Sequence, residues 1–430
     1  MRGALLAGAS AVLAGMLACA GSAQAADAAA TPMLQFTVPP IGLRVDDLAV
    51  VVNDADPASV EVGRYYAERR KISTDRMVHV RLPAGQPTMS AADFERVQEV
   101  LRDKVPASVQ AYALAWTLPY RVECMSITSA FAFGFDRAYC AEGCQPTKPS
   151  PYFDSASNAP FTDHALRPAM LLAGRTVADA KALIDRGVRS DERWPDGAAY
   201  LLSTSDRNRN VRAASHDLVR RRLNAAYAIR RIEGDELDGA QDVMFYFTGM
   251  ERVAGIASNR FLDGAIADHL TSLGGLLDDS PQTSVLEWLT AGATGSYGTT
   301  SEPCNYRAKF PEIGVVMGRY LGGETLIEAY WKSVRMPGQG VFVGEPLARP
   351  FGGLRIDRSG AELVLRTRLL RPGRYVLEAA AGPVGPFRRL AGLVVAGVGV
   401  HELRLPAGPA RVYRLLAVPT TSPVSARPRD

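Results

Sequence analysis

The sequence predicts an α/β protein with a mostly parallel sheet flanked by helices, followed by a small C-terminal β-sandwich. Two patterns carry this prediction. Up to about residue 350, uninterrupted apolar runs of strand length alternate with amphipathic helical stretches, as in a parallel sheet that is covered on both faces. Beyond Pro350, short strands are separated by Gly and Pro turns at the spacing of a sandwich.

The first two strand and helix units are the most regular. Residues 48–52 form a continuous apolar run, and Asp56-Pro57 then starts a helix that continues through Tyr66 to Arg70. The unit recurs, with Ser90 as the start of a second helix whose apolar positions follow helical spacing. The corresponding strands are expected at 48–52, 77–82 and 111–116.

Residues 119–168 interrupt this regularity. Pro, Ser, Cys and aromatic residues dominate, and neither a strand nor a helix period is visible. Loops of this length in compact domains are usually functional or tied down. We therefore expect a long irregular insertion that disulfides hold in place.

The alternation then resumes. Strands are expected at 170–173, 198–202 and 242–247, a further strand-like piece at 264–271, and helices at 177–186, 283–289 and 325–334. The arginine-rich segment 207–231 is interpreted as a solvated helical face, and 292–298 as a tightly packed strand whose glycines let another element approach. Tyr330 and Trp331 are expected in the core.

The domain organisation follows from these changes of period. The six strands of the predicted sandwich lie at 354–356, 362–367, 374–379, 389–395, 401–405 and 411–416. We expect a leader over 1–25, an α/β domain over 40–350 with a candidate division into two subdomains near 165–205, and a sandwich domain over 351–418.

The first residues predict export. Arg2 precedes an uncharged apolar run over 4–20, and Ala23-Gln24-Ala25 has the small-x-small pattern of a signal peptidase site. The run is short for a membrane span, so cleavage is favoured over an uncleaved anchor or a lipid attached to Cys19. We expect a periplasmic or secreted protein whose mature chain has no integral membrane segment.

Charge and motifs exclude several functions. Without Arg2 the chain has 48 basic and 45 acidic residues, too near neutrality for a nucleic-acid partner. The glycines of 292–298 lack the Gly-Lys-Ser/Thr ending of a phosphate loop, and Asp154, Asp163 and His164 lack the regular spacing of metal ligands. The sequence therefore predicts no cofactor and no metal.

The cysteines beyond the leader are Cys124, Cys140, Cys144 and Cys304. An even number outside the cytosol favours disulfides, and three pairings are open. A zinc site is the alternative for the pair Cys140 and Cys144, although the paired short spacings of structural zinc sites are missing. Cys304 is also a candidate free nucleophile.

The order of these elements resembles the gingipain-type cysteine peptidases of the caspase-like fold. The resemblance covers about residues 45–416, and its residues are the run 242–249 and the phrase Leu171-Leu172-Ala173-Gly174-Arg175 before a helix. It implies a caspase- or gingipain-like sheet followed by the sandwich. Such peptidases place His-Gly at the end of one strand and Cys at the end of the next, because a thiolate needs a nearby imidazole.

The chain also resembles an uncharacterised bacterial family of exported proteins that co-occur with exosortase. The segments that carry the resemblance are Val51-Val52-Asn53, Tyr65-Tyr66-Ala67, Gly292-Ala293-Thr294-Gly295-Ser296-Tyr297-Gly298, Glu302-Pro303, Glu328-Ala329-Tyr330-Trp331 and residues 340–350. The resemblance implies a link to surface-polymer or protein-sorting systems, without an established reaction.

The peptidase dyad does not carry over. The first relevant strand ends Thr248-Gly249-Met250, without histidine, and the next offers His269 and Ser272 but no cysteine. We therefore expect an accessory factor that binds an envelope protein or a polysaccharide. The alternative is an active cysteine- or serine-type hydrolase, resembling a peptidase, that uses His269 with Cys304 or Ser272.

Overall fold

The computed structural model describes residues 35–38, 41–141, 143–359, 362–406, 410 and 412–418. The predicted signal peptide lies outside these residues. No helix in the described ranges combines the length and the apolar character that crossing a membrane requires.

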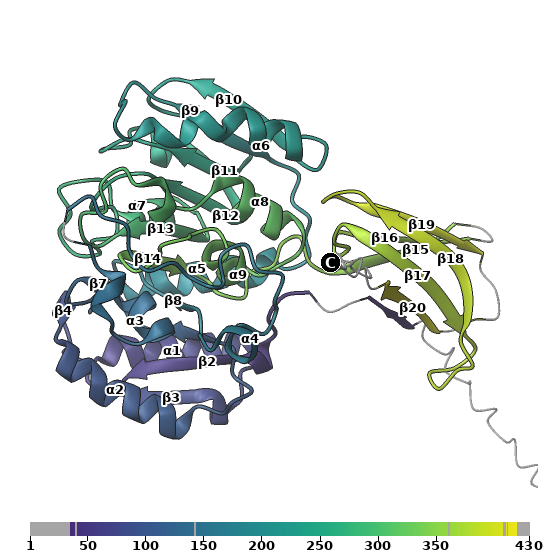
Figure 1. The fold of residues 1–430 in the computed structure, drawn as a ribbon, viewed down its shortest axis with the longest axis horizontal. Coiled ribbons are helices and arrows are strands. Elements are labelled where there is room, and N and C mark those ends of the chain that lie inside the picture. The colour runs from purple at the N-terminus through teal and green to yellow at the C-terminus, as the bar shows by residue number, and fades with distance from the viewer. Residues whose placement is uncertain are drawn as a thin grey trace, which may run out of the picture.

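Within the described residues, ten strands form one large sheet (Figure 1). One set of five consists of β2 (Leu48–Asn53), β3 (Met77–Val80), β5 (Ala111–Leu114), β8 (Ala169–Leu171) and β14 (Gly340–Gly344). The other set consists of β9 (Ala198–Ser203), β10 (Ala228–Glu233), β11 (Val243–Thr248), β12 (Phe261–His269) and β13 (Gly295–Thr299). The order across the sheet is β10-β9-β11-β12-β13-β14-β8-β5-β2-β3.

The two sets repeat one topology. Counted along the chain, each runs second, first, third, fourth, fifth from its outer edge, an order found among doubly wound α/β proteins. Neighbours within a set are parallel, whereas β13 and β14 are antiparallel, with Gly295 opposite Gly344. The carboxyl ends of the two sets therefore lie at opposite edges of the sheet.

Helices cover both faces of the sheet, which confirms the predicted α/β architecture. The helices are α1 (Pro57–Arg70), α2 (Ala91–Lys104), α3 (Ile127–Phe133), α4 (Pro160–His164), α5 (Val177–Ser190), α6 (His216–Leu223), α7 (Val285–Thr290), α8 (Ile313–Leu321) and α9 (Leu326–Trp331). Side chains alternate along β2: Val50 packs in the cluster that contains Tyr66 of α1, and Val51 packs in the cluster that contains Phe94 of α2.

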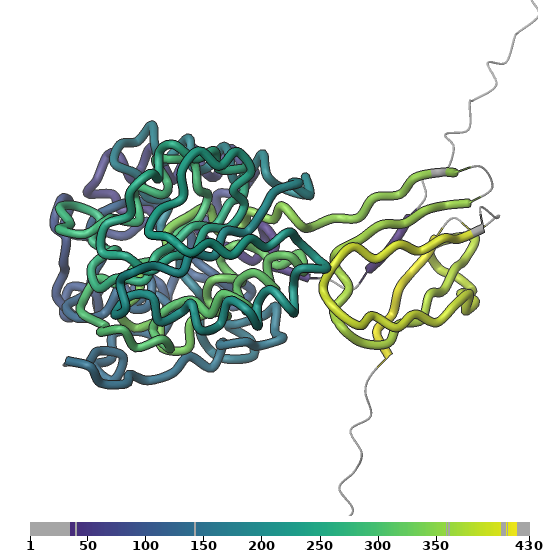
Figure 2. The backbone as a smooth tube through the Cα atoms, turned by 90° about the horizontal axis from the view of Figure 1, so that it is seen from above, coloured from purple at the N-terminus to yellow at the C-terminus, as the bar shows by residue number. Residues whose placement is uncertain are grey.

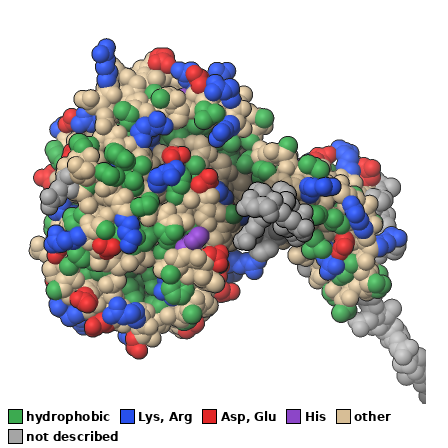
Figure 3. All heavy atoms as spheres, in the orientation of Figure 1, with side chains coloured by type: hydrophobic (Ala, Val, Ile, Leu, Met, Phe, Trp, Pro, Cys, Tyr) green, Lys and Arg blue, Asp and Glu red, His purple; other side chains and the backbone are tan. Residues whose placement is uncertain are grey.

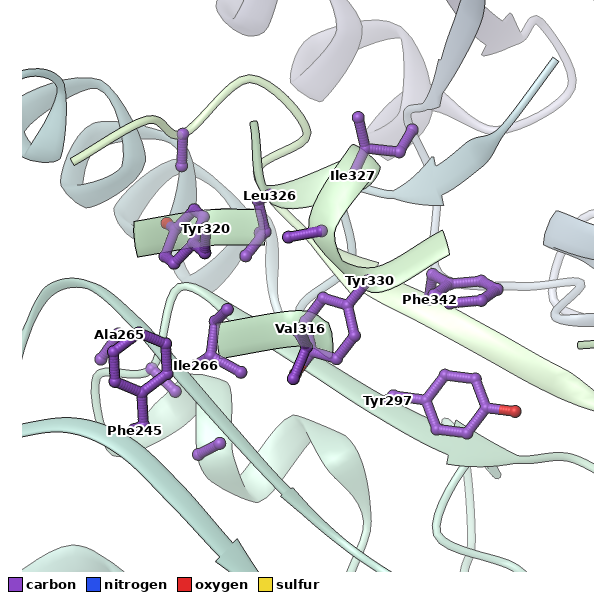
Figure 4. Close-up of a cluster of buried hydrophobic side chains, with 14 of the residues drawn as sticks. Phe245, Ala265, Ile266, Tyr297, Val316, Tyr320, Leu326, Ile327, Tyr330 and Phe342 are labelled. Carbon is purple, nitrogen blue, oxygen red and sulfur yellow. The ribbon is translucent and has the colours of Figure 1, made fainter. Parts of the chain in front are cut away.

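The helices α8 and α9 bury aromatic and branched side chains against the middle of the sheet. Figure 4 shows Tyr320 and Val316 of α8 among Phe245 and Ile266 of the strands. Tyr330 and Trp331 are completely buried, as the sequence predicts, and the ring of Trp331 stacks on Phe342 at 4.5 Å between centroids. This packing fixes α8 above the second set of strands.

The insertion contains a helix that the sequence pattern does not reveal. α3 is buried apart from its last residue, Phe133, and contacts β8 and β14, whereas the prediction was an irregular segment throughout. Its seven residues are too few to be stable alone, so tertiary packing forms this helix. The rest of the insertion includes β6 (Arg121–Val122) and β7 (Met125–Ser126), which form a small sheet with β4 (Thr88–Met89).

The arginine-rich segment is only partly the helical face that the sequence predicts. A 3₁₀ turn, η4 (Asn210–Ser215), precedes α6, and the last residues form the strand β10 instead of a helix. β10 lies at the edge of the sheet, where charged side chains such as those of Arg230 and Arg231 face solvent. Such charges protect an edge strand from pairing with another chain, and they hide its strand character in the sequence.

The C-terminal residues form two further sheets to one side of the large sheet (Figure 2). One consists of β15 (Leu354–Ser359), β16 (Glu362–Thr367) and β19 (His401–Pro406), and the other of β17 (Gly373–Ala380), β18 (Arg388–Val395), β20 (Val412–Ala417) and β1 (Gln35–Thr37). All six predicted strands are present, and both sheets contribute to one hydrophobic cluster. The sequence did not predict β1, which pairs in parallel with β20.

The glycines of β13 allow close packing, as predicted for 292–298. A Cβ built on Gly298 would lie 2.5 Å from the backbone nitrogen of Gly275, and one on Gly295 would overlap Leu326. Backbone atoms of a neighbouring loop therefore occupy the space that any side chain at 298 would need.

We predict that Gly298→Ala lowers the free energy of unfolding by about 1–3 kcal/mol, because the contact is with backbone that cannot move aside cheaply. Urea denaturation measures the change. Gly318→Ala on α8 is the matched control, since its Cβ would meet no atom within 4 Å. In a helix this control should gain up to about 1 kcal/mol. Equal effects of the two substitutions would contradict the packing argument.

Candidate functional site

The carboxyl ends of β9, β11, β12 and β13 meet at one edge of the sheet, and the catalytic candidates follow two of these strands. Ligands of open α/β sheets usually bind beyond the carboxyl ends of the strands. His269 is the last residue of β12, Ser272 follows it closely, and Cys304 lies in the loop after β13. We name residues 204–210, 249–251, 270–275 and 300–304 the second carboxyl edge, because they follow strands of the second set, β9 to β13.

His269 is buried in the core. Its side chain packs beside Trp288, whose Nε1 donates a hydrogen bond of 3.0 Å to His269 Nδ1, and the residue is 1% exposed. Burial lowers the pKa of His269 to about 3, and the positive charge of Arg212 acts in the same direction. The imidazole is therefore neutral at physiological pH and is not accessible to a substrate.

The structure pairs the four cysteines as two disulfides. Cys124 bonds to Cys140 within the insertion, and Cys144 bonds to Cys304, which ties the insertion to the loop after β13. This is one of the three pairings that the sequence left open. It places Cys140 and Cys144, the closely spaced pair of the alternative zinc site, in different disulfides. In this state the sulfur of Cys304 is not a free nucleophile.

Ser272 and Cys304 meet at a carboxylate. Ser272 Oγ donates a hydrogen bond of 3.0 Å to Glu302 Oε1, and the backbone N–H of Cys304 donates to the same oxygen at 2.6 Å. Thr299 Oγ1 in turn donates to the carbonyl oxygen of Ser272. The structure thus brings Ser272 and Cys304 together, but neither forms a hydrogen bond with His269.

Arg209, directly before η4, connects three loops of the second carboxyl edge. Its Nε donates to Thr271 Oγ1 at 3.0 Å, and its guanidinium also pairs with Asp206 and Glu251. A Cβ built on Gly249 would lie 2.0 Å from the carbonyl oxygen of Arg209, so the two backbones are in direct contact. The loops after β9, β11 and β12 are therefore packed against one another.

Below this layer Arg212 and Asp268 form a buried ion pair. Arg212 Nη1 donates to Asp268 Oδ1 at 2.6 Å, and Nη2 donates to the carbonyl oxygen of Thr248 at 2.9 Å. Both side chains are more than nine-tenths buried. Burial raises the pKa of Asp268, and Arg212 opposes that rise. The sequence interpretation of this arginine as solvated was wrong; the signal was an aspartate inside an apolar strand, which requires a buried partner.

A groove lies outside this closed edge, between α6 and α8. Its volume is about 810 Å³, within the range of about 300–1,000 Å³ that is usual for ligand pockets. Apolar side chains such as Leu218, Val219 and Val315 line it together with several arginines, and Arg212 reaches it from the buried pair. The sequence analysis did not identify this groove, because its two helices are remote in the chain.

Among the described residues no group of three or more His, Cys, Asp or Glu side chains could hold a metal ion. Compared with models of known protein families and with curated proteins, the sequence gives no match. The function is therefore argued from the geometry of the second carboxyl edge and of the groove.

We predict that Arg212→Met lowers the free energy of unfolding by about 3–5 kcal/mol, because it leaves the carboxylate of Asp268 buried without a counter-charge. Arg209→Met is the matched control: its ion pairs are partly exposed, so the loss should stay below about 1 kcal/mol. Urea denaturation at neutral pH measures both. Adding Asp268→Asn to Arg212→Met should recover part of the loss, and equal losses for the two arginine variants would contradict the buried pair.

The buried His269 also predicts a pH dependence. Its folded pKa of about 3 lies below the unfolded value of about 6.5, so the unfolded chain binds the additional proton between these values. Stability from this residue is complete above about pH 6.5 and is lost as the pH falls toward 3. His269→Asn, which keeps an acceptor for Trp288, should reduce the slope of unfolding free energy near pH 5 by up to about 1.4 kcal/mol per pH unit. Parallel pH curves for the two proteins would show that the imidazole is charged in the folded state.

Proposed function

We propose that this chain is an exported accessory protein that binds a partner in the cell envelope, a protein or a polysaccharide, and that the second carboxyl edge performs no catalysis. One observation carries the proposal: each candidate catalytic side chain is committed to a structural contact. His269 is buried against Trp288, Ser272 is bound to Glu302, and Cys304 is bonded to Cys144. A nucleophile of the predicted kind needs an imidazole base within hydrogen-bond reach, and His269 forms no hydrogen bond with Ser272 or Cys304 in the described structure; the carboxylate that Ser272 contacts, that of Glu302, is exposed to solvent.

The proposal includes the finer fold assignment. Residues 40–350 would be a caspase- or gingipain-like domain whose catalytic dyad has been lost, and 351–418 a β-sandwich. The mostly parallel sheet with helices on both faces supports the first assignment. The hydrophobic cluster that the two C-terminal sheets share supports the second.

The proposed compartment is the periplasm or the exterior, reached with the signal peptide of residues 1–25. The two disulfides support this compartment, because such bonds persist in oxidising environments. The resemblance to exported proteins that co-occur with exosortase adds a role in surface-polymer or protein-sorting processes. A C-terminal sandwich would serve there as a second binding or attachment unit.

Activity probes test the absence of catalysis. We expect that a fluorophosphonate probe does not label Ser272 and that iodoacetamide does not label Cys304 in the purified, oxidised chain. An active serine hydrolase and a reduced thiol peptidase serve as positive controls, and mass spectrometry of tryptic peptides reads out the modified residue.

Labelling of Ser272 that disappears in His269→Asn would overturn the proposal in favour of a serine-type hydrolase. Reduction before iodoacetamide treatment should expose Cys304 in both the wild type and His269→Asn at equal rates. A rate that depends on His269 would indicate a cysteine-type hydrolase instead.

A further inference from the structure

The groove between α6 and α8, which we name the α6–α8 groove, has an unpartnered apolar floor. Leu218 of α6 is 42% exposed, although it lies beside the buried Val219. A Cβ built on Gly318 of α8 would meet no atom within 4 Å, so the helix is open to the groove at this position. Gly314 and Gly322, one turn to either side, also line the groove.

Arginines dominate the charges of the groove. The described lining contains Arg212, Arg222, Arg307, Arg319 and Arg371 against Asp154, Glu312 and Glu324. Arg319 and Arg371 both pair with Glu324, at 3.2 and 3.0 Å, which leaves them partly neutralised. Arg222 and Arg307 are exposed, and neither forms an ion pair within the described residues. Figure 3 shows basic and hydrophobic side chains interspersed on the face that carries α6 and α8.

Arg212 links the groove to the buried ion pair. It lines the groove, it is 5% exposed, and its Nε has no hydrogen-bond partner in the described structure. A buried donor without a partner costs free energy. Asp268 neutralises the charge of Arg212, and its Oδ2 also has no hydrogen-bond partner in the described structure, so the preference for an anionic occupant comes from the exposed arginines of the groove.

The lining favours a peptide over a glycan. No aromatic side chain and no Asn or Gln is among the described residues of the groove, although sugar rings are usually held by aromatic faces and amide groups. Leucine, isoleucine, valine and glycine instead form a surface on which aliphatic side chains pack. The chain's own last residues, 419–430, carry Arg427, Arg429 and a single acid, Asp430, so their charge does not complement the groove.

We propose that the α6–α8 groove binds a short peptide segment of a partner protein in which carboxylates alternate with branched aliphatic side chains. The aliphatic groups lie on the glycine face of α8, and the carboxylates pair with Arg222 and Arg307 at the rim. This inference rests on the proposed binding function and narrows its partner to a protein with an acidic, apolar segment.

Fluorescence anisotropy tests the inference with the purified, oxidised chain. The probe is a short fluorescein-labelled peptide in which Glu alternates with Leu and Val. Matched peptides replace Glu by Lys, or Leu and Val by Ser. We expect saturable binding of the first peptide alone, weakened by salt because exposed arginines contribute.

Two variants locate the site. Gly318→Leu places a side chain in the floor at a position where a Cβ would meet no atom within 4 Å, and a double variant, Arg222→Glu with Arg307→Glu, reverses the rim charge. Each should weaken binding about tenfold or more, equivalent to about 1.4 kcal/mol. Arg221→Glu is the matched control, since Arg221 lies on the same helix but does not line the groove. Its affinity should stay within about twofold of the wild type, well inside that 1.4 kcal/mol.

Several results would overturn the inference. These are equal binding of the Lys peptide, equal effects of Arg221→Glu and of the double variant Arg222→Glu with Arg307→Glu, no binding of the acidic peptide, or binding of alginate in its place with the same variant pattern. The last result would assign the groove to an anionic polysaccharide. Mass spectrometry of the peptide after incubation separates the two proposals, because cleavage would contradict the non-catalytic function whether or not the groove binds.

Discussion

The antiparallel pairing of β13 with β14 joins two sets of parallel strands into one ten-stranded sheet. β14 belongs to the first set by its parallel pairing with β8, yet the chain reaches it only after the second set is complete. The first set is therefore completed only after the second. Because the sets run in opposite directions, their carboxyl ends lie at opposite edges, and chemistry at one edge is separated from the other.

Buried charges hold this arrangement together. Glu345, directly after β14, pairs with Arg70 of α1 and accepts a hydrogen bond of 2.6 Å from Tyr66, so the returning strand is bonded to the first helix of the chain. Lys332 and Glu324 form a second buried pair next to α9, at 2.8 Å. Removing one member of such a pair costs more than the pair contributes, because the partner stays buried. These ion pairs hold the segments after β14 and α9 in position, and their net contribution to the free energy of unfolding is small.

The two candidate functional regions differ in how closely their segments are packed. At the second carboxyl edge, loops are packed so closely that Gly249 contacts the backbone of Arg209, and a disulfide draws the insertion over the loop after β13. The α6–α8 groove is the opposite case: Gly318 opens onto it, and Arg222 and Arg307 in its lining form no ion pair among the described residues. The proposed binding function therefore places the partner at the groove and not at the closed edge.

The sequence by itself determined the elements whose signal is local. Apolar runs and capped helices predicted β2 and α1, because burial on both faces of a sheet requires continuous apolar segments. Gly and Pro turns at the spacing of a sandwich predicted the C-terminal strands. The exported character and the presence of disulfides are likewise predictions from composition and order. Only the tertiary structure decided the pairing of Cys144 with Cys304, the helix α3 and the burial of Arg212. Each of these depends on contacts between segments that are remote in the chain, and the local periodicity of the sequence gives no information about such contacts.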